Sequence, residues 1–394
     1  MRSVNFLINS LGNGGAERVV LALASYFVAQ GVVVRIIALT RSCAYSLPEG
    51  VEVYYLSEGY DEESSSTQRM LLIPYYAWRL KKLVQRHKIP VIQSHLFRAN
   101  YVNLFTLRLG STHRAQVVNH SVASRFIGAG LSGRFNLTLI RWLYPSAERI
   151  VTISKRMSMD LQSLVAFDVP LCVIYNPYDI AMVQRAKEQP LEGAFHFYPH
   201  RRYLVAVGRL IPLKRYEDII EALVALPSEV ELIILGADGG SLGRLKSRVD
   251  DLNLISRVHF LGQVRNPFPY IKRADLLVLS SQTEGFPNVL IEAMLCGTPV
   301  IATDCVSGPR EILAPELDPR EQLRQGLIWA RYGVLYPVGD CGALTKGVAR
   351  LLDESMLRER YATRGYARAT EFALEKIARL YQQLLERRDD SCPT

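Results

Sequence analysis

The chain has 394 residues, of which 49% are hydrophobic and 22% are charged. These values are near the globular average, which excludes a disordered or fibrous chain, and the length suggests two or three domains. No apolar run reaches the roughly 18–20 residues that span a bilayer, and the first residues lack the pattern of a secretory signal. The six cysteines form no CxxC. They indicate neither a disulfide framework nor a structural zinc site, and they favour a reducing cytoplasm.

Charge is unevenly distributed along the chain. Residues 1–178 contain 19 Lys and Arg against 10 Asp and Glu, a net charge of +9, whereas residues 179–394 contain 28 of each. Residues 64–147 contain 12 basic residues and no acidic one. Such a basic field favours an anionic partner, with a merely solvated face as the alternative. No RNA- or DNA-binding motif is present, so we expect an anionic membrane surface and no nucleic acid.

In chain order, short β-branched runs alternate with segments of helical period. In the first half, strands are predicted at residues 4–8, 32–39, 51–56, 90–94, 115–119, 149–153 and 171–175. Helices are predicted between most of them, at residues 16–30, 68–88, 99–109, 131–144 and 154–166. In the second half, strands are predicted at residues 203–207, 231–235, 257–261, 275–279 and 299–303, again with helices between them. This alternation predicts α/β domains with parallel sheets covered by helices on both faces.

The alternation runs twice and is interrupted at residues 176–202, which have little strand pattern and are interpreted as a linker. We therefore predict two doubly wound, Rossmann-like domains, at residues 1–180 and 181–370. A helix within residues 371–394 is predicted to pack back on the first domain. The carboxyl ends of both sets of strands are expected to face a central cleft, because open α/β sheets bind ligands at that edge.

A glycine-rich segment, residues 12–18, follows the first predicted strand and opens a helix. Gly14 and Gly15 would let the backbone approach a ligand, and the N–H groups of the helix start suit an anion. The segment is not GxGxxG, so the standard dinucleotide fingerprint is absent, and a simple tight turn is an equal alternative.

Two basic residues and one histidine stand at the ends of predicted strands. Arg209 follows the strand at 203–207 after a glycine, and Lys214 lies five residues further on. Two cations at the mouth of a strand suit a diphosphate, although surface charges are the alternative. His120 directly follows the strand at 115–119. There a ligand-binding role competes with that of a structural histidine.

Residues 284–292, EGFPNVLIE, give the strongest local signal. Pro287 suits the first turn of a helix, which places Glu284 in the loop before it and Glu292 on its inner, apolar face. A carboxylate in such a place needs a partner. A ribose diol is suitable because an ionised carboxylate only accepts hydrogen bonds, and an internal Lys or Arg is the alternative. The helix start at Asn288 and Val289 would suit a phosphate.

Gly14-Gly15, Arg209 with Lys214, and Glu284-x7-Glu292 together resemble the retaining glycosyltransferases of family 4, which have the GT-B fold. Residues 259–264 and 307–311 are also similar to family patterns, and the resemblance extends over essentially the whole chain. It is nearest to bacterial enzymes that extend glycans on polyprenyl diphosphate or for surface polysaccharides. It implies a retaining transferase that moves a hexose or N-acetylhexosamine from a nucleotide sugar, with UDP favoured over GDP by the resemblance only.

The resemblance also implies residue roles. Arg209 and Lys214 would stabilise the leaving nucleotide, Glu284 would contact the transferred sugar, and His120 would contact a sugar hydroxyl. Glu292 would hold the ribose. The donor-binding positions would be Gly14, Gly15, Val264, Phe286, Pro287, Asn288, Val289 and Glu292. No cofactor or metal is expected, because the nucleotide sugar is a substrate and the sequence contains no Asp-x-Asp.

Two predicted helices suggest a membrane-facing surface. Residues 75–88 place Arg79, Lys82 and Arg86 on one helical face, with Tyr75, Tyr76 and Trp78 at its start. The helix at 131–144 places further cations on one stripe; the acceptor- or membrane-facing set is Arg18, Arg79, Lys82, Arg86, Arg134 and Arg141. We predict that this surface docks on anionic lipid at the inner, cytoplasmic face of the membrane and receives a polyprenyl-diphosphate or glycan acceptor. Ordinary amphipathic helices packed on the sheet are the alternative.

Two other functions remain open at this point. A GT-B sugar-nucleotide epimerase would need no acceptor groove. A non-catalytic scaffold for anionic membranes would explain the basic first half, but it would leave Arg209, Lys214, Glu284 and Glu292 without a purpose. Residues 315–330 look like an insertion, for which the sequence predicts no role.

Overall fold

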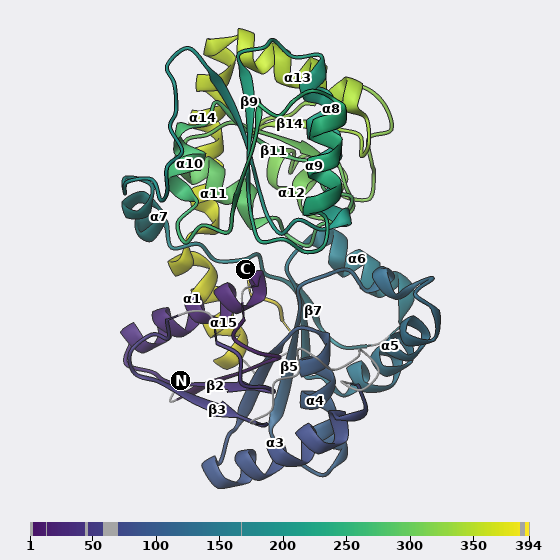
Figure 1. Ribbon diagram of the computed structural model, residues 1–394. Coiled ribbons are helices and arrows are strands. Elements are labelled where there is room, and N and C mark those ends of the chain that lie inside the picture. Colours follow the sequence, from purple (N-terminus) through teal and green to yellow (C-terminus); the bar gives the residue numbers. More distant parts are fainter. Residues whose placement is uncertain are drawn as a thin grey trace. The chain divides into compact units, whose positions relative to one another are not determined.

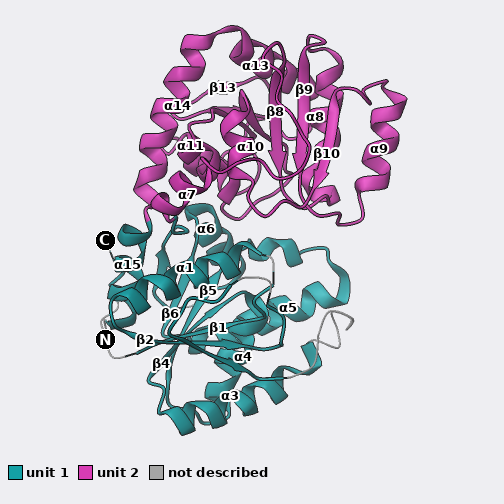
Figure 2. Ribbon diagram, turned by 60° about the vertical axis from the view of Figure 1, so that its left-hand side comes forward, with its two compact units in different colours: residues 1–178, 374–394 teal, residues 179–373 magenta. Residues whose placement is uncertain are grey.

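The computed structural model describes residues 3–12, 14–43, 46–57, 70–166, 168–386 and 391–393. The chain divides into two compact units (Figure 2). Unit 1 comprises Met1–Tyr178 and Leu374–Thr394, and unit 2 comprises Asp179–Ala373. Residues 371–373, grouped with the last helix on sequence grounds, therefore lie in unit 2.

Unit 1 is built on a seven-stranded parallel sheet with the order β3-β2-β1-β4-β5-β6-β7 (Figure 1). Its strands are β1 (Ser3–Ile8), β2 (Val33–Ala38), β3 (Val51–Tyr55), β4 (Val91–His95), β5 (Arg114–Asn119), β6 (Arg149–Thr152) and β7 (Leu171–Val173). All seven were predicted, because a strand buried on both faces is a short, nearly continuous apolar run that is easily recognised.

The helices of unit 1 begin where local sequence satisfies the first turn. They are α1 (Gly15–Ala29), α3 (Ile73–His87), α4 (Phe97–Arg108), α5 (Gly130–Leu143), α6 (Lys155–Leu164) and α15 (Leu374–Glu386), with 3-10 turns η1 (Ala123–Phe126) and η2 (Tyr144–Ser146). Ser154 caps α6 by accepting a hydrogen bond from the Met157 N–H at 3.1 Å. Pro74 lies in the first turn of α3, where its missing N–H costs nothing. The predicted start of α3 at residues 68 and 69 lies outside the described residues.

The end of the chain is tied to the sheet of unit 1. Helix α15 packs on α1, and the carbonyl groups of Leu384 and Leu385 accept hydrogen bonds from Gln116 and Arg114 at 3.0 and 2.7 Å. A disulfide joins Cys172 on β7 to Cys392. The sequence analysis was wrong to indicate no disulfide. It considered short CxxC spacings, whereas these two cysteines are 220 residues apart and meet because the chain returns to unit 1.

Unit 2 repeats the architecture, with the sheet order β10-β9-β8-β11-β12-β14-β13. Its strands are β8 (Arg202–Val207), β9 (Val230–Leu235), β10 (Val258–Gly262), β11 (Leu276–Leu279), β12 (Val300–Thr303), β13 (Ile328–Trp329) and β14 (Val334–Tyr336). Strand β13 is antiparallel to β14, and the other pairs are parallel. The sequence analysis missed β13 and β14, because two or three residues are too short to show a period.

The helices of unit 2 are α7 (Ile180–Ala186), α8 (Tyr216–Val224), α9 (Leu242–Asp251), α10 (Phe268–Arg273), α11 (Asn288–Cys296), α12 (Pro309–Leu313), α13 (Cys341–Asp353) and α14 (Ser355–Ala369), with turns η3 (Pro212–Lys214) and η4 (Thr370–Phe372). Helix α7 corrects the interpretation of residues 176–202 as a linker. Asp179 caps it by accepting from the Met182 N–H at 2.8 Å, and α7 packs on α10 and α11. Within the part of the chain that the structure describes, no helix has both the length and the apolar character of a membrane span.

Candidate active site

In unit 2, the carboxyl ends of β8 and β11 bring two predicted site residues together. Lys214 lies in η3 and Glu284 in the loop after β11. The Lys214 Nζ atom is 2.6 Å from Glu284 Oε1, and the two side chains are 23% and 13% exposed. The Ser281 hydroxyl donates to the same oxygen at 2.5 Å. Two further bonds hold the loops, from the Ser280 hydroxyl to the Lys214 carbonyl (2.7 Å) and from the Gln282 N–H to the Leu213 carbonyl (2.9 Å).

Arg209 stands at the same edge of the sheet, one residue after Gly208. It is exposed, and its side chain makes no hydrogen bond or ion pair with any residue that the structure describes. The turn before it is tight. Gly208 has φ 151°, its carbonyl accepts from the Tyr216 hydroxyl at 2.7 Å, and a Cβ atom on Gly236 would overlap that carbonyl. The loop therefore presents a guanidinium group with no competing acid, as an anion-binding site requires.

The loop that carries Glu284 is fastened to the loop after β12. The Thr303 hydroxyl donates to the Ser281 carbonyl at 2.7 Å, and the Ser307 hydroxyl donates to the Gly285 carbonyl at 2.8 Å. Gly308 has φ 87°, and a Cβ atom there would collide with the Pro287 ring. The start of α11 is thus held in a fixed place.

The predicted donor-binding residues of this loop and of α11 differ in what they present. Glu292 is on α11 and only 3% exposed, as the sequence predicted for the second glutamate. Asn288 and Val289 are partly exposed at the start of the helix, and Val264 is partly exposed in the loop after β10. Phe286 is buried, with its ring centroid 5.2 Å from that of Phe372. Its side chain belongs to the core of unit 2, which leaves only its backbone for a ligand.

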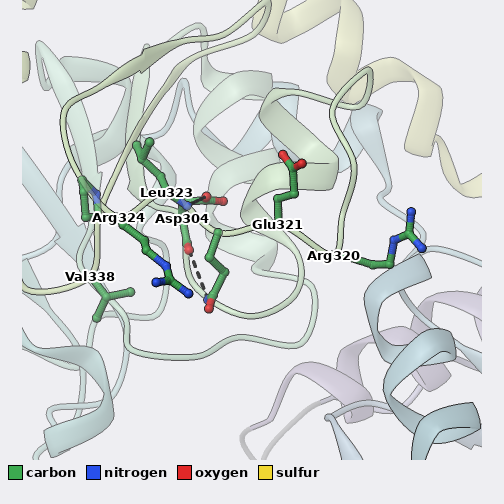
Figure 3. Close-up of a pocket in the computed structure, with 8 residues that line it drawn as sticks. Asp304, Arg320, Glu321, Leu323, Arg324 and Val338 are labelled. Carbon is green, nitrogen blue, oxygen red and sulfur yellow. Dashed lines mark hydrogen bonds between the residues drawn. The ribbon is translucent and has the colours of Figure 1, made fainter.

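The segment 315–330 forms the wall of a cavity of about 610 Å³ at the carboxyl ends of β12 and β14 (Figure 3). Its floor is Asp304, which is 1% exposed, pairs with Arg310 and accepts the Leu323 N–H at 2.6 Å. The Gln322 side chain donates to the Asp304 carbonyl at 3.4 Å. Arg320 and Arg324 both line the cavity, and Arg320 also pairs with Asp318 (Figure 3). The insertion is thus anchored on the sheet of unit 2.

In unit 1, the carboxyl ends of β4 and β5 carry two histidines. These strands are neighbours, with His95 opposite Val118. His95 Nδ1 is 2.9 Å from Nε2 of His120, the histidine that the sequence singled out. Burial lowers the pKa of His120 to about 3. Burial, followed by the neighbouring His120, lowers the pKa of His95.

The sequence analysis did not single out His95. The available signal was its position at the end of a strand adjacent to that of His120. Because the carboxyl ends of neighbouring parallel strands meet at one edge, two such histidines are expected to be close.

The glycine segment is also at this edge, at the start of α1. Gly14 is the N-cap, with φ −139°, and Gly15 is exposed. A Cβ atom on Gly14 would overlap the carboxylate of Glu17, so this side chain lies against the turn. On the other side, the Asn9 side chain accepts the Ala99 N–H at 3.0 Å and joins the end of β1 to α4. A larger residue at position 14 would require the Glu17 side chain to move.

Comparison with known proteins decides the family. Residues 13–182 match the family model "Glycosyltransferase Family 4", and residues 191–368 match "Glycosyl transferases group 1". The chain belongs to the glycosyltransferases. Its resemblance to family 4 is thereby confirmed.

The alignments with relatives and with solved structures cover nearly the whole length of the glycosyltransferase. A curated relative from Campylobacter jejuni, "N-acetylgalactosamine-N,N'-diacetylbacillosaminyl-diphospho-undecaprenol 4-alpha-N-acetylgalactosaminyltransferase", is 28% identical over 96% of this chain and 98% of its own. "Phosphatidyl-myo-inositol mannosyltransferase" of Mycobacterium leprae is 27% identical over 89% of this chain and 87% of its own. Anabaena Alr3699/HepE, solved in complex with UDP-glucose, superposes with a TM-score of 0.75 at 19% identity over 97% and 99%. Sucrose-phosphate synthase from Thermosynechococcus elongatus superposes with a TM-score of 0.76 at 21% identity, and the match covers 98% of this chain and 99% of that one. The predicted GT-B fold class is confirmed.

Exposed cations and aromatic rings alternate on α3 of the glycosyltransferase. Arg79, Lys82 and Arg86 are all exposed. The Lys82 ammonium is 3.5 Å from the centre of the Trp78 ring, which is 48% exposed. Tyr76 corrects the prediction of an interfacial aromatic, because it is 2% exposed and belongs to the core under α3.

Helix α5 has a similar outer face, and α4 packs against both α3 and α5. Arg134, Thr138 and Arg141 are exposed, and so are about half of the Phe135 and Trp142 rings. Arg18 lies elsewhere, in the first turn of α1, the helix that packs on α15. Five of the six predicted acceptor- or membrane-facing cations are thus on α3 and α5, which are joined through α4; we call the outer faces of α3 and α5 the basic aromatic surface.

Proposed function

We propose that this glycosyltransferase is a retaining enzyme that transfers a hexose or N-acetylhexosamine from a UDP-sugar to a lipid-linked or polysaccharide-precursor glycan. The observation that carries the proposal is the arrangement at the edge of unit 2, where Arg209 stands beside the Lys214–Glu284 pair. A nucleotide sugar presents a diphosphate and a ring of hydroxyl groups. The edge offers cations for the first and a carboxylate acceptor for the second.

In the proposed reaction, the bond between the sugar and the diphosphate breaks, and the new glycosidic bond forms on the same face of the sugar. Negative charge develops on the leaving nucleotide, and Arg209 and Lys214 stabilise it. The ammonium group of Lys214 has three protons, so it can keep Glu284 and still donate to a phosphate oxygen. The donor phosphate accepts the proton of the acceptor hydroxyl. Neither a metal nor a cofactor enters this scheme.

The proposed identity of the donor has two supports. Glu292 is a buried carboxylate on α11, suited to a ribose diol. The Anabaena protein with the same fold was solved with UDP-glucose. The acceptor class is supported by the relatives, whose names refer to diphospho-undecaprenol and to phosphatidyl-myo-inositol, both lipid-linked.

The experiment for the proposed activity has two steps. A thermal-shift screen of UDP- and GDP-sugars identifies a donor, because a ligand that binds the folded state raises Tm. Nucleotide release from that donor is then measured with and without a polyprenyl-diphosphate-linked glycan, and the anomeric configuration of the product is determined by NMR. Release that depends on the acceptor, with retained configuration, supports the proposal. Inversion would refute retention, and conversion of the donor without an acceptor would indicate an epimerase.

We also propose that the basic aromatic surface attaches the enzyme peripherally to the inner face of the cytoplasmic membrane. Each cation near an anionic bilayer contributes about 1 kcal/mol, so several suffice for reversible attachment that salt weakens. Half-exposed Trp78 and Trp142 suit the head-group level.

The membrane proposal is tested by co-sedimentation with anionic and neutral liposomes at low and high salt. The variant that changes Arg79, Lys82 and Arg86 to Glu is expected to lose binding to anionic liposomes. The matched control changes Arg244, Lys246 and Arg248 to Glu on α9 of unit 2, and it should bind like the wild type. Equal binding to both lipids, or full retention by the α3 variant, would refute the attachment.

A further inference from the structure

We propose that His95 is a positioning residue that holds His120 in its neutral form with the proton on Nδ1. His120 then offers a hydrogen-bond donor to an oxygen atom of the substrate. The nature of that substrate, a sugar, rests on the proposed function; the tautomer does not.

A single proton lies between the two rings. His95 Nδ1 and His120 Nε2 are 2.9 Å apart, so one of them donates and the other accepts. The other nitrogen of His95, Nε2, is buried and has no hydrogen-bond partner among the described residues. If His95 carried its proton there, an N–H group would be buried without an acceptor, which is rarer in proteins than an unpaired acceptor.

The proton of His95 is therefore on Nδ1 and is donated to His120 Nε2. A neutral imidazole has one proton, so that of His120 must be on Nδ1. This atom makes no hydrogen bond to the residues that the structure describes, and His120 is only partly buried. It is a donor at the carboxyl edge of β5, beside His95 and therefore near the start of α4.

The surroundings of His95 fix the ring. Phe6 packs edge-on against it, with ring centroids 5.7 Å apart. Leu96, the next residue, has φ 75°, a conformation that a residue with a Cβ atom adopts only when its neighbours impose it. Two backbone hydrogen bonds do so, from the Leu96 N–H to the Val118 carbonyl at 3.2 Å and from the Asn100 N–H to the Leu96 carbonyl at 2.9 Å.

The same geometry opposes protonation of the pair. A third proton on the pair would either set two N–H groups against each other or place one on the buried Nε2 of His95. The charged residues on the adjoining elements are Glu17 and Arg18 on α1, Arg98 and Arg108 on α4, Arg125 on η1, and Lys155, Arg156 and Asp160 on α6. Arg125 donates to Ser121, and Asp160 accepts the N–H groups of residues 123 and 124. His120 is thus a neutral donor and not a general base, which suits an oxygen atom that must be oriented.

Imidazole ¹⁵N NMR of the full chain tests the tautomer directly. The seven histidines are assigned with His120→Gln, His95→Gln and, as a matched control, His200→Gln in unit 2. In the wild type we expect the protonated nitrogen of His120 to be Nδ1, with no titration between pH 5 and 8. A proton on Nε2, or titration in that range, would overturn the proposal without any need for a variant.

The His95→Gln variant then tests the positioning role. A glutamine amide can either donate to His120 Nε2 or, after rotation, accept from it, so it no longer selects the tautomer. We expect a mixture of tautomers and a fall in kcat of about tenfold. Burial of His120 should still keep it neutral between pH 5 and 8. Affinity for free UDP should not change, because the nucleotide is assigned to unit 2.

Two results separate this proposal from the proposed function. A mixed tautomer in His95→Gln with wild-type kcat would overturn the positioning role, while the transfer activity would stand. If the proposed function failed, no nucleotide sugar would turn over in the wild type, and the NMR experiment would still decide the tautomer.

Discussion

The two units contain the same kind of sheet but place different chemistry at its carboxyl edge. At the edge of unit 2 the polar groups are charged and partly solvated: Lys214 and Glu284 form an ion pair, and Arg209 is exposed beside them. At the edge of unit 1 they are neutral, with His95 fully buried against His120. The first five strands follow the same order in both sheets, so the difference at these two edges comes from the loops.

This contrast shows how one architecture serves two tasks. A charge can remain at an edge only where solvent or a partner offsets its desolvation, as the Lys214–Glu284 pair does. A fully buried imidazole instead loses its charge and becomes a donor or acceptor of fixed orientation. Charged groups suit a diphosphate, and neutral groups suit hydroxyls. We therefore expect the two edges to respond differently to substitution and to pH.

The largest expected effect concerns the charged edge. Arg209→Ala and Lys214→Ala should each lower kcat by about 10²–10³-fold, as the loss of one preorganised donor does. The controls are Arg244→Ala and Lys246→Ala, exposed residues of the same types on α9. Steady-state kinetics with the identified donor provide the measurement, and circular dichroism checks the fold. Near-normal turnover would remove the affected residue from the mechanism.

Much of this edge was predictable. Lys214 and Glu284 were singled out from spacing and family resemblance, and the parallel sheet then explains why residues 70 positions apart meet. Glu292 was placed on the inner face of its helix because Pro287 suits the first turn and the residues around Glu292 are apolar. Such patterns depend on local sequence, which is why they can be read without a structure.

The neutral edge was much less predictable. His95 carries no local signal, because its meaning arises from a partner on the next strand. Tyr76 follows Tyr75 in sequence but is in the core, since one residue turns a helix by about 100° and changes the face. The Cys172–Cys392 disulfide requires the chain to return to unit 1. Long-range pairing of this kind is absent from composition and spacing.

The disulfide gives the second comparison between the units. Cys392→Ser should destabilise unit 1 by about 2–4 kcal/mol, because the untethered chain end regains freedom when unfolded, and unit 2 should not change. Hydrogen exchange measured by mass spectrometry resolves the two units. Cys43→Ser is the control, because that thiol is exposed and outside the disulfide. An equal loss of stability in both units would contradict this prediction, and so would a free Cys392 thiol in non-reducing peptide mapping.

Glu292 tests whether the nucleotide belongs to unit 2. Glu292→Ala should weaken free UDP by about 1.5–3 kcal/mol, the range for a hydrogen bond to a charged group. Glu292→Gln keeps the size of the side chain and one acceptor oxygen. Its affinity for UDP should lie between those of the wild type and the alanine variant. Calorimetry gives the affinities, with the exposed Glu229→Ala as control. Unchanged affinity in the alanine variant would refute the ribose role.

The smallest effect per residue is the loss of stability expected at low pH. It should again differ between the two units. Unit 1 contains three wholly or partly buried histidines whose pKa values are lowered by desolvation: His95, His113, to about 4, and His120, to about 3. They stay neutral when folded but bind protons near pH 6.5 when unfolded, so stability falls as the pH drops below that value. The free energy of unfolding keeps falling until the pH reaches the pKa values of the folded state, by roughly 1 kcal/mol per histidine per pH unit.

Between pH 7 and 5 this effect should appear in unit 1 and hardly in unit 2, where His196 and His200 are exposed and His259 pairs with Glu231. Hydrogen exchange at the two pH values, corrected for intrinsic rates, measures both units in one sample. His113→Gln should reduce the pH dependence of unit 1. His113 is suitable because its ring bonds Ser111 and Asn103, away from the proposed site, and His200→Gln is its control. If both units lost stability equally, burial of neutral histidines would not be what distinguishes the two edges.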